Sequence, residues 1–176
     1  YISIFFCVQI IALNLFAMQP KVTPVDYVRP QIDTHKSRWF FFSSASRPFG
    51  MVSLSPDTWT EGSWNSGYLY NSKEIRCFSH VHCWQLAGVP VMPTTGEVKG
   101  HKGMDAYKST YSHETEIVKP GYHKVELDTY QIRVELTSTS RVGMHRYTYP
   151  AGEKANVLFD VGALLAHGKT EKAAIH

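Results

Sequence analysis

A chain of 176 residues with 43% hydrophobic and 13% aromatic residues is long enough for one domain with a real core, and this composition excludes a disordered protein. The net charge of +3 arises from 18 basic and 15 acidic residues that are mixed along the chain. There is no basic block and no aromatic RNA-binding signature, so we expect no nucleic-acid partner. The ten Tyr, nine Phe and four Trp residues favour β structure.

Residues 1–19 contain no charged side chain and are predicted to be the apolar part of a signal peptide. Because the segment is about as long as a membrane span, an uncleaved signal anchor is the alternative, and we expect membrane contact only in that case. No initiator Met or basic segment precedes it, so we expect a truncated leader. These features predict an exported protein that is periplasmic, attached to the cell surface or extracellular.

Residues 20–30 include three prolines and are expected to form an extended linker. Residues 47–57 alternate in polarity and end in Pro-Asp, which predicts a strand and a turn. Residues 58–71 combine glycines with aromatic side chains, among them Trp64, which is typical of a ligand-facing loop. The alternative is that these aromatic side chains close one end of the fold. Residues 100–103 are predicted to be a mobile loop.

Short strands follow in the second half of the chain, at 107–113, 116–119, 122–128, 131–137, 142–149 and 156–160. Val125 and Leu127 alternate with charged residues, and Val134 and Leu136 do the same on the next strand, as expected for an antiparallel sheet with one solvated face. This spacing predicts an all-β fold, an antiparallel β-sandwich over residues 31–166. Residues 167–176 are expected to begin a continuation into a further domain.

The densest group of polar and aromatic residues is FSHVHCWQLAGVPVMP, residues 78–93. His80 and His82 are two residues apart, so on a regular strand their side chains share one face. Trp84 and Gln85 precede a small-residue stretch, which suggests a flat ring presented by a loop, a common way to stack a sugar. The alternative is that the histidines are structural and Trp84 is part of the core.

Cysteine chemistry is not strongly indicated. A zinc site formed by Cys77, His80, His82 and Cys83 would need a sharp turn within the strand, so we disfavour it. Cys77 and Cys83 pair as a disulfide only if the chain bends between them, and we favour two buried thiols.

No spacing in the chain identifies a catalytic group. There is no Gly-rich phosphate loop, no GxSxG elbow and no HExxH pair. Carboxylates occur at Asp57, Glu61, Glu74, Glu114 and Glu116, but no pattern pairs any two of them, and we expect most to be solvated. We therefore assign no catalytic residue and no metal ligand.

Five blocks, taken in order, carry a resemblance to a known family. They are RPFGMVSLSPDT (47–58), GSWNSGYLY (62–70), CFSHVHCWQLAGVPVMPTTG (77–96), YSHETEIVKPGYHKVEL (111–127) and ELTSTSRVGMHRYTYP (135–150). Together they resemble the N-terminal domain of family 92 glycoside hydrolases, which are exported, calcium-dependent, inverting α-mannosidases. The opening segment at residues 28–34 departs from the family pattern, since it lacks the usual aromatic residue and glycine.

The resemblance implies an N-terminal β-sandwich followed by a helical (α/α)6 barrel domain that is missing from this sequence. In that architecture the catalytic carboxylates and most calcium ligands lie in the missing domain, so this fragment alone is expected to be inactive. The full-length partner would be an α-mannose-containing glycan. The sandwich would contribute to the edge of the substrate pocket through Trp64, His80, His82, Trp84 and Gln85. A non-catalytic carbohydrate-binding sandwich and a purely structural sandwich are the alternatives.

Overall fold

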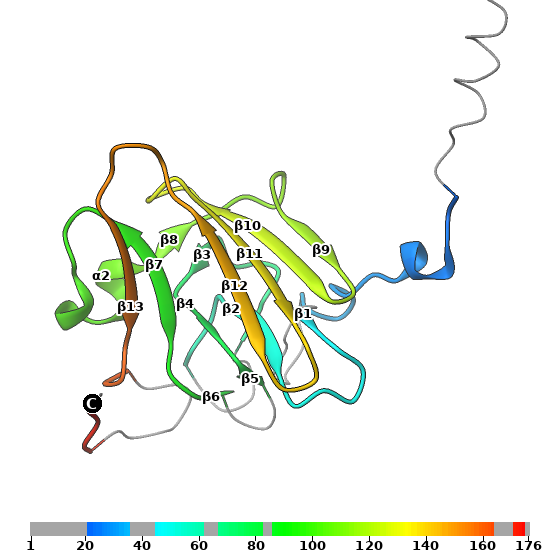
Figure 1. Ribbon diagram of the computed structural model, residues 1–176, viewed down its shortest axis with the longest axis horizontal. Helices are drawn as coiled ribbons and strands as arrows, with labels where there is room; N and C mark the ends of the chain where they lie inside the picture. The colour runs from blue at the N-terminus through cyan, green and yellow to red at the C-terminus, as the bar shows by residue number, and fades with distance from the viewer. Residues whose placement is uncertain (1–20, 36–44, 62–66, 83–85, 164–170, 175–176) are drawn as a thin grey trace, which may run out of the picture.

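The computed structural model describes residues 21–35, 45–61, 67–82, 86–163 and 171–174 of the chain. Within these ranges two antiparallel sheets face each other, so the predicted all-β sandwich is confirmed (Figure 1). The predicted leader at residues 1–19 lies outside the described residues. Among the residues that are described, no helix is both long enough and apolar enough to cross a membrane.

The first sheet has five strands in the order β1-β2-β4-β7-β13. Their bounds are β1 (Ala45–Ser46), β2 (Ser53–Asp57), β4 (Cys77–Ser79), β7 (Val91–Thr95) and β13 (Ala155–Phe159). The strand predicted over residues 47–57 is shorter than expected because its first part forms a turn, in which the Gly50 N–H donates to the Arg47 carbonyl at 2.9 Å. β2 ends at Asp57, which pairs with Cys77 at the start of β4.

The second sheet has four strands in the order β12-β11-β10-β9. Their bounds are β9 (Ile117–Lys119), β10 (Tyr122–Leu127), β11 (Ile132–Ser138) and β12 (Gly143–Thr148), close to the predicted ranges. The alternation sets the register, with Val125 opposite Val134. β9 and β10 are joined by Pro120-Gly121, where proline fixes one backbone angle and Gly121 takes a φ of 78° that side chains disfavour.

Shorter elements surround the sheets. They are η1 (Pro24–Tyr27), η2 (Gly100–Lys102), α2 (Met104–Tyr107), and two strand pairs, β3 (Glu74–Ile75) with β8 (Ser109–Thr110) and β5 (Val81–His82) with β6 (Leu86–Ala87). The predicted loop at residues 100–103 is mostly the 3-10 helix η2. The strand predicted over 107–113 is confined to β8, because the Lys108 N–H bonds to the Met104 carbonyl at 2.9 Å and closes α2 first.

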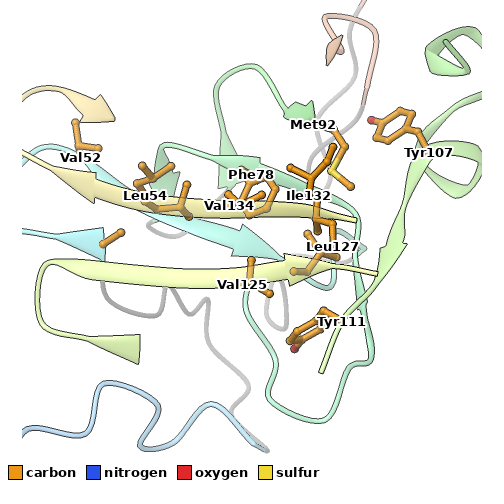
Figure 2. Close-up of a cluster of buried hydrophobic side chains, with 13 residues drawn as sticks. Val52, Leu54, Phe78, Met92, Tyr107, Tyr111, Val125, Leu127, Ile132 and Val134 are labelled. Carbon is orange, nitrogen blue, oxygen red and sulfur yellow. The ribbon is translucent and has the colours of Figure 1, made fainter. Parts of the chain in front are cut away.

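The core lies between the two sheets. Leu54 and Phe78 of the first sheet are fully buried, as is Val134 of the second (Figure 2). The other buried residues of this cluster include Met92, Val125, Leu127, Ile132, Leu136, Tyr107 and Tyr111. Burial of one such side chain contributes about 1.5–3 kcal/mol to the stability of the fold, so the core holds the ends of the strands in place. The polar residues described next are built on those ends.

Candidate functional site

A cavity of about 670 Å³ lies beside α2 and η2. Its wall includes Thr60 and Glu61 from the segment after β2, Arg76 just before β4, and Asp160 just after β13. His101 and Met104 also line the cavity, and they add one polar and one apolar side chain respectively. Segments that are far apart in the sequence therefore meet around one hollow of the size of a small-molecule site.

Arg76 is the cation of this cavity. Its side chain is 15% exposed, and its guanidinium lies 3.6 Å from Glu61 and 3.5 Å from Asp105. The guanidinium carbon is also 5.9 Å from the centroid of the Trp59 ring, within the range of a cation–π contact. Since the two ion pairs are long, the guanidinium retains N–H groups that can donate to hydroxyl groups of a ligand.

Asp160 is the best-fixed carboxylate of the cavity. Its Oδ2 accepts a hydrogen bond from the Tyr107 hydroxyl at 2.8 Å, and its Oδ1 accepts one from the Gly162 N–H at 3.2 Å. Burial raises the pKa of Tyr107, and its bond to Asp160 raises it further. The phenol therefore stays protonated at neutral pH and holds the Asp160 carboxylate in one orientation.

The segment that carries Trp64 leaves the sheet next to this cavity. The Trp59 N–H donates to the Gly67 carbonyl at 3.0 Å, and the Gly67 N–H donates back to the Trp59 carbonyl at 2.7 Å. This bridge closes the base of the loop at residues 60–66. Trp64 itself lies outside the described residues, so its predicted role at the substrate edge stays a prediction.

His82 is buried and directly precedes the second predicted loop in the sequence. Its side chain and that of Asp57 are both 0% exposed, and His82 Nε2 lies 2.6 Å from Asp57 Oδ1. His82 Nδ1 lies 2.5 Å from the Ser53 carbonyl oxygen. Both ring nitrogens thus face acceptors within the protein, an arrangement that suits a supporting role better than direct contact with a substrate. Trp84 and Gln85 follow in the connection between β5 and β6, outside the described residues.

His80 takes a different direction from His82. It sits at a bend between β4 and β5, and its Nε2 lies 2.9 Å from Nε2 of His145 on β12. The prediction that the two histidines share one face is wrong, because the bend interrupts the strand on which it depended. His80 is half-buried, and burial lowers its pKa, as does the charge of His82. Its predicted contact with substrate stays a prediction.

The same bend brings His82 to the side of Cys77. This buried thiol lies 3.4 Å from Asp57 Oδ2, so Cys77 and His82 contact the same carboxylate although a straight strand would point them apart. Burial raises the pKa of the Cys77 thiol, and the neighbouring Asp57 raises it further. Cys77 is therefore a protonated donor to Asp57. Cys83 lies outside the described residues, so a disulfide with Cys77 is not tested.

Metal ligands do not gather in the described part of the chain. Among those residues there is no group of three or more His, Cys, Asp or Glu side chains arranged to hold a metal ion. Of the cavity carboxylates, Glu61 forms an ion pair with Arg76. Asp160 accepts a hydrogen bond from Tyr107. The described residues therefore do not fit a calcium site, and the expected calcium stays a prediction about other parts of the protein.

A second polar network, centred on Glu116, was not predicted from the sequence. Its carboxylate is 2% exposed and accepts hydrogen bonds from His113 Nδ1 at 2.5 Å, His123 Nε2 at 2.7 Å and the Tyr68 hydroxyl at 2.9 Å. Burial opposes ionisation, but these hydrogen bonds, that of His123 foremost, hold the pKa of Glu116 below its usual value. The available signal was His123, which shares the buried face of β10 with Val125.

The family comparison covers most of the chain. Residues 27–176 match the family model described as the glycosyl hydrolase family 92 N-terminal domain. A comparison with curated protein sequences finds no match.

Solved structures of the same family show the same fold. The family GH92 α-mannosidase BT3965 of Bacteroides thetaiotaomicron is 35% identical with a TM-score of 0.71, and the match covers 80% of this chain and 20% of that chain. Its complex with mannoimidazole gives 36% identity and a TM-score of 0.68, over 76% and 19% of the two chains. The inverting mannosidase BT2199 from the same organism is 26% identical with a TM-score of 0.66, over 79% and 20%. This chain thus spans about a fifth of the length of these relatives.

Proposed function

This chain belongs to glycosyl hydrolase family 92, and on that premise we propose that it is the N-terminal sandwich domain of an exo-acting α-mannosidase. The full-length enzyme would hydrolyse α-mannosidic bonds of glycans with inversion at the anomeric carbon. The observation that carries the proposal is the family match over residues 27–176, with an α-mannosidase of 35% identity as a structural relative.

The sandwich would form one edge of the substrate pocket. The cavity at Arg76 and Asp160 supports this role, because it offers fixed hydrogen-bonding groups close to the exposed ring of Trp59. A sugar needs both features, since its hydroxyl groups form hydrogen bonds while its C–H face packs on an aromatic ring. The loops that carry Trp64, Trp84 and Gln85 would extend the same edge.

The hydrolytic carboxylates would lie in a separate helical domain. The match to about 20% of each mannosidase chain supports this, because it leaves most of those chains without a counterpart here. We also propose that the enzyme is exported, as the uncharged leader indicates, and that it uses calcium bound by residues outside the described ranges. The isolated sandwich would then be inactive.

The test is an activity assay on the full-length protein with α-mannobiose substrates, in which proton NMR follows the first product formed. Release of β-mannose before mutarotation is expected for an inverting enzyme, whereas α-mannose would contradict inversion. A second assay with a calcium chelator is expected to abolish activity, which added calcium should restore. Binding of mannosides without hydrolysis would instead support a carbohydrate-binding protein, and neither binding nor hydrolysis would support a structural sandwich.

A further inference from the structure

Asp160 lies where the edge strand β13 ends at the wall of the cavity. It directly follows β13, and its N–H donates to the Pro90 carbonyl at 3.0 Å, so its backbone is held against the neighbouring segment. The next residues form a turn, in which the Ala163 N–H donates to the Asp160 carbonyl at 3.4 Å. We propose that the Asp160 carboxylate accepts a hydrogen bond from a hydroxyl group of the glycan, and that Tyr107 is the positioning residue that holds it for this contact.

The Asp160 carboxylate can accept a further hydrogen bond from the cavity. Its Oδ2 accepts one from the Tyr107 hydroxyl at 2.8 Å, and its Oδ1 accepts one from the Gly162 N–H at 3.2 Å. Since a carboxylate has about four acceptor positions, these two bonds leave positions for a donor on a ligand. A sugar hydroxyl is such a donor, whereas the oxygens of an ionised phosphate group are acceptors. The arrangement therefore suits a hydroxyl group rather than an anionic group.

Tyr107 is fixed independently of Asp160. It is 1% exposed and lies at one edge of the buried cluster between the sheets (Figure 2). Its backbone carbonyl accepts a hydrogen bond from the Tyr130 hydroxyl at 2.9 Å. Because the ring is packed and the main chain is bonded, the Tyr107 hydroxyl is a donor at a fixed place. Its bond to Asp160 limits the positions that the carboxylate can take.

Arg76 adds a hydrogen-bond donor to the same cavity. Its ion pairs with Glu61 and Asp105 measure 3.6 and 3.5 Å, which is longer than the roughly 2.9 Å of a charge-assisted hydrogen bond. The N–H groups can therefore also donate to a ligand oxygen. Sugar hydroxyls both donate and accept, so an acceptor at Asp160 and a donor at Arg76 match them. Asp160 and Tyr107 would have their roles in the proposed mannosidase, on which the assignment rests.

Kinetics of the full-length enzyme with deoxy substrates test the Asp160 contact. The probes are the α-mannobiose that the natural enzyme hydrolyses fastest and its monodeoxy derivatives. For at least one derivative the natural enzyme should show a KM about tenfold higher than for the parent, with kcat within about threefold, because one hydrogen bond is lost. In Asp160→Ala the KM for the parent should rise by about the same factor, and the penalty for that derivative should disappear.

Two Tyr→Phe variants test the positioning role. Tyr107→Phe keeps the buried ring and removes only the hydroxyl that bonds to Asp160. It should raise KM for the parent about fivefold and reduce the deoxy penalty at least about threefold, while kcat changes less than about threefold. Tyr130→Phe is the matched control, because its hydroxyl bonds to the Tyr107 carbonyl and the packing of the Tyr107 ring remains. Its KM should stay within about twofold of the natural value.

Three results would overturn the proposal. They are a natural enzyme that tolerates every monodeoxy derivative, an Asp160→Ala variant that retains the full deoxy penalty, and a Tyr107→Phe variant with the same KM as Tyr130→Phe. If Asp160→Ala does not fold, Tyr107→Phe decides, because its deoxy penalty must still be smaller than that of the natural enzyme.

A direct binding measurement separates this proposal from the mannosidase function. A natural protein without hydrolytic activity would refute that function alone. Saturation-transfer NMR with methyl α-mannopyranoside would then decide on Asp160, since the signal should weaken in Asp160→Ala and Tyr107→Phe and persist in Tyr130→Phe. Equal signals in all variants, or no binding by the natural protein, would overturn the proposed contact as well.

Discussion

The contact between His80 and His145 makes the sandwich sensitive to mild acid. Burial lowers the pKa of His145 to about 4, and repulsion from His80 adds to this. Burial raises the pKa of Tyr147, so its hydroxyl stays protonated and can donate to His145 Nδ1, 2.7 Å away. His145 Nε2–H can then donate to His80 Nε2 at 2.9 Å, and both histidines are neutral. A further proton on either histidine must displace one of these hydrogen bonds.

The sign and the size follow from linkage. The unfolded chain takes up a proton at His145 near pH 6.5, whereas the folded chain resists it down to about pH 4. The unfolded state therefore binds more protons in this window, and stability falls as the pH drops from 6.5 to 4. At about 1.4 kcal/mol for each pH unit, this difference corresponds to about 3 kcal/mol of unfolding free energy.

The substitution His145→Gln removes the titrating group. Urea unfolding of the purified chain, followed by tryptophan fluorescence at pH 7, 5.5 and 4, should show that the natural chain loses about 3 kcal/mol more than the variant across this range. His101→Gln is the matched control, since His101 is exposed. If the natural chain and His145→Gln lose stability in parallel, to within about 1 kcal/mol, protonation of His145 does not cause the loss.

Three further predictions concern other sites. Glu116→Gln should lower the free energy of unfolding at pH 7 by about 3–5 kcal/mol in urea titrations, because it leaves the buried His123 and the partly exposed His113 without their carboxylate. The variant should also lose less stability than the natural chain as the pH falls below 4.5. In the natural chain the pKa of folded Glu116 is lowered, so protonation of this carboxylate favours the unfolded state. Gly143→Ala places a Cβ 2.5 Å from His80 Cδ2, so a loss of about 1–3 kcal/mol is expected, measured as a lower urea midpoint. Arg76→Met in the full-length enzyme should raise KM for α-mannosides about tenfold with a stability change below 1 kcal/mol, since its ion-pair partners are exposed.

The sequence was informative where the chain is regular. Val125 and Val134 alternate with charged residues, and this pattern places the two strands, their buried face and their register. It fails at His80, where the chain bends and the two histidines turn to separate partners. No local pattern encodes a bend of this kind, because it depends on what β12 and β2 offer on either side.

The burial of two carboxylates could not be predicted from the sequence either. Charged residues are solvated in most proteins, and this expectation is wrong for Asp57 and Glu116, whose side chains are 0% and 2% exposed. The partners of Glu116 come from as far away as Gln31, 85 positions earlier, and Asp57 binds a histidine 25 positions further along the chain. Such networks are assembled by the topology of the sheets, so spacing along the sequence cannot reveal them.

Strands β2 and β4 of the first sheet are buried on both faces, and the two buried layers differ in kind. Leu54 and Phe78 face the apolar core, while Asp57, Cys77 and Ser79 alternate with them and face the buried polar group around His82. An apolar layer tolerates small shifts of its members, whereas a buried polar layer is stable only when each hydrogen bond is made. On β2 and β4 the buried polar side therefore allows less displacement than the apolar side.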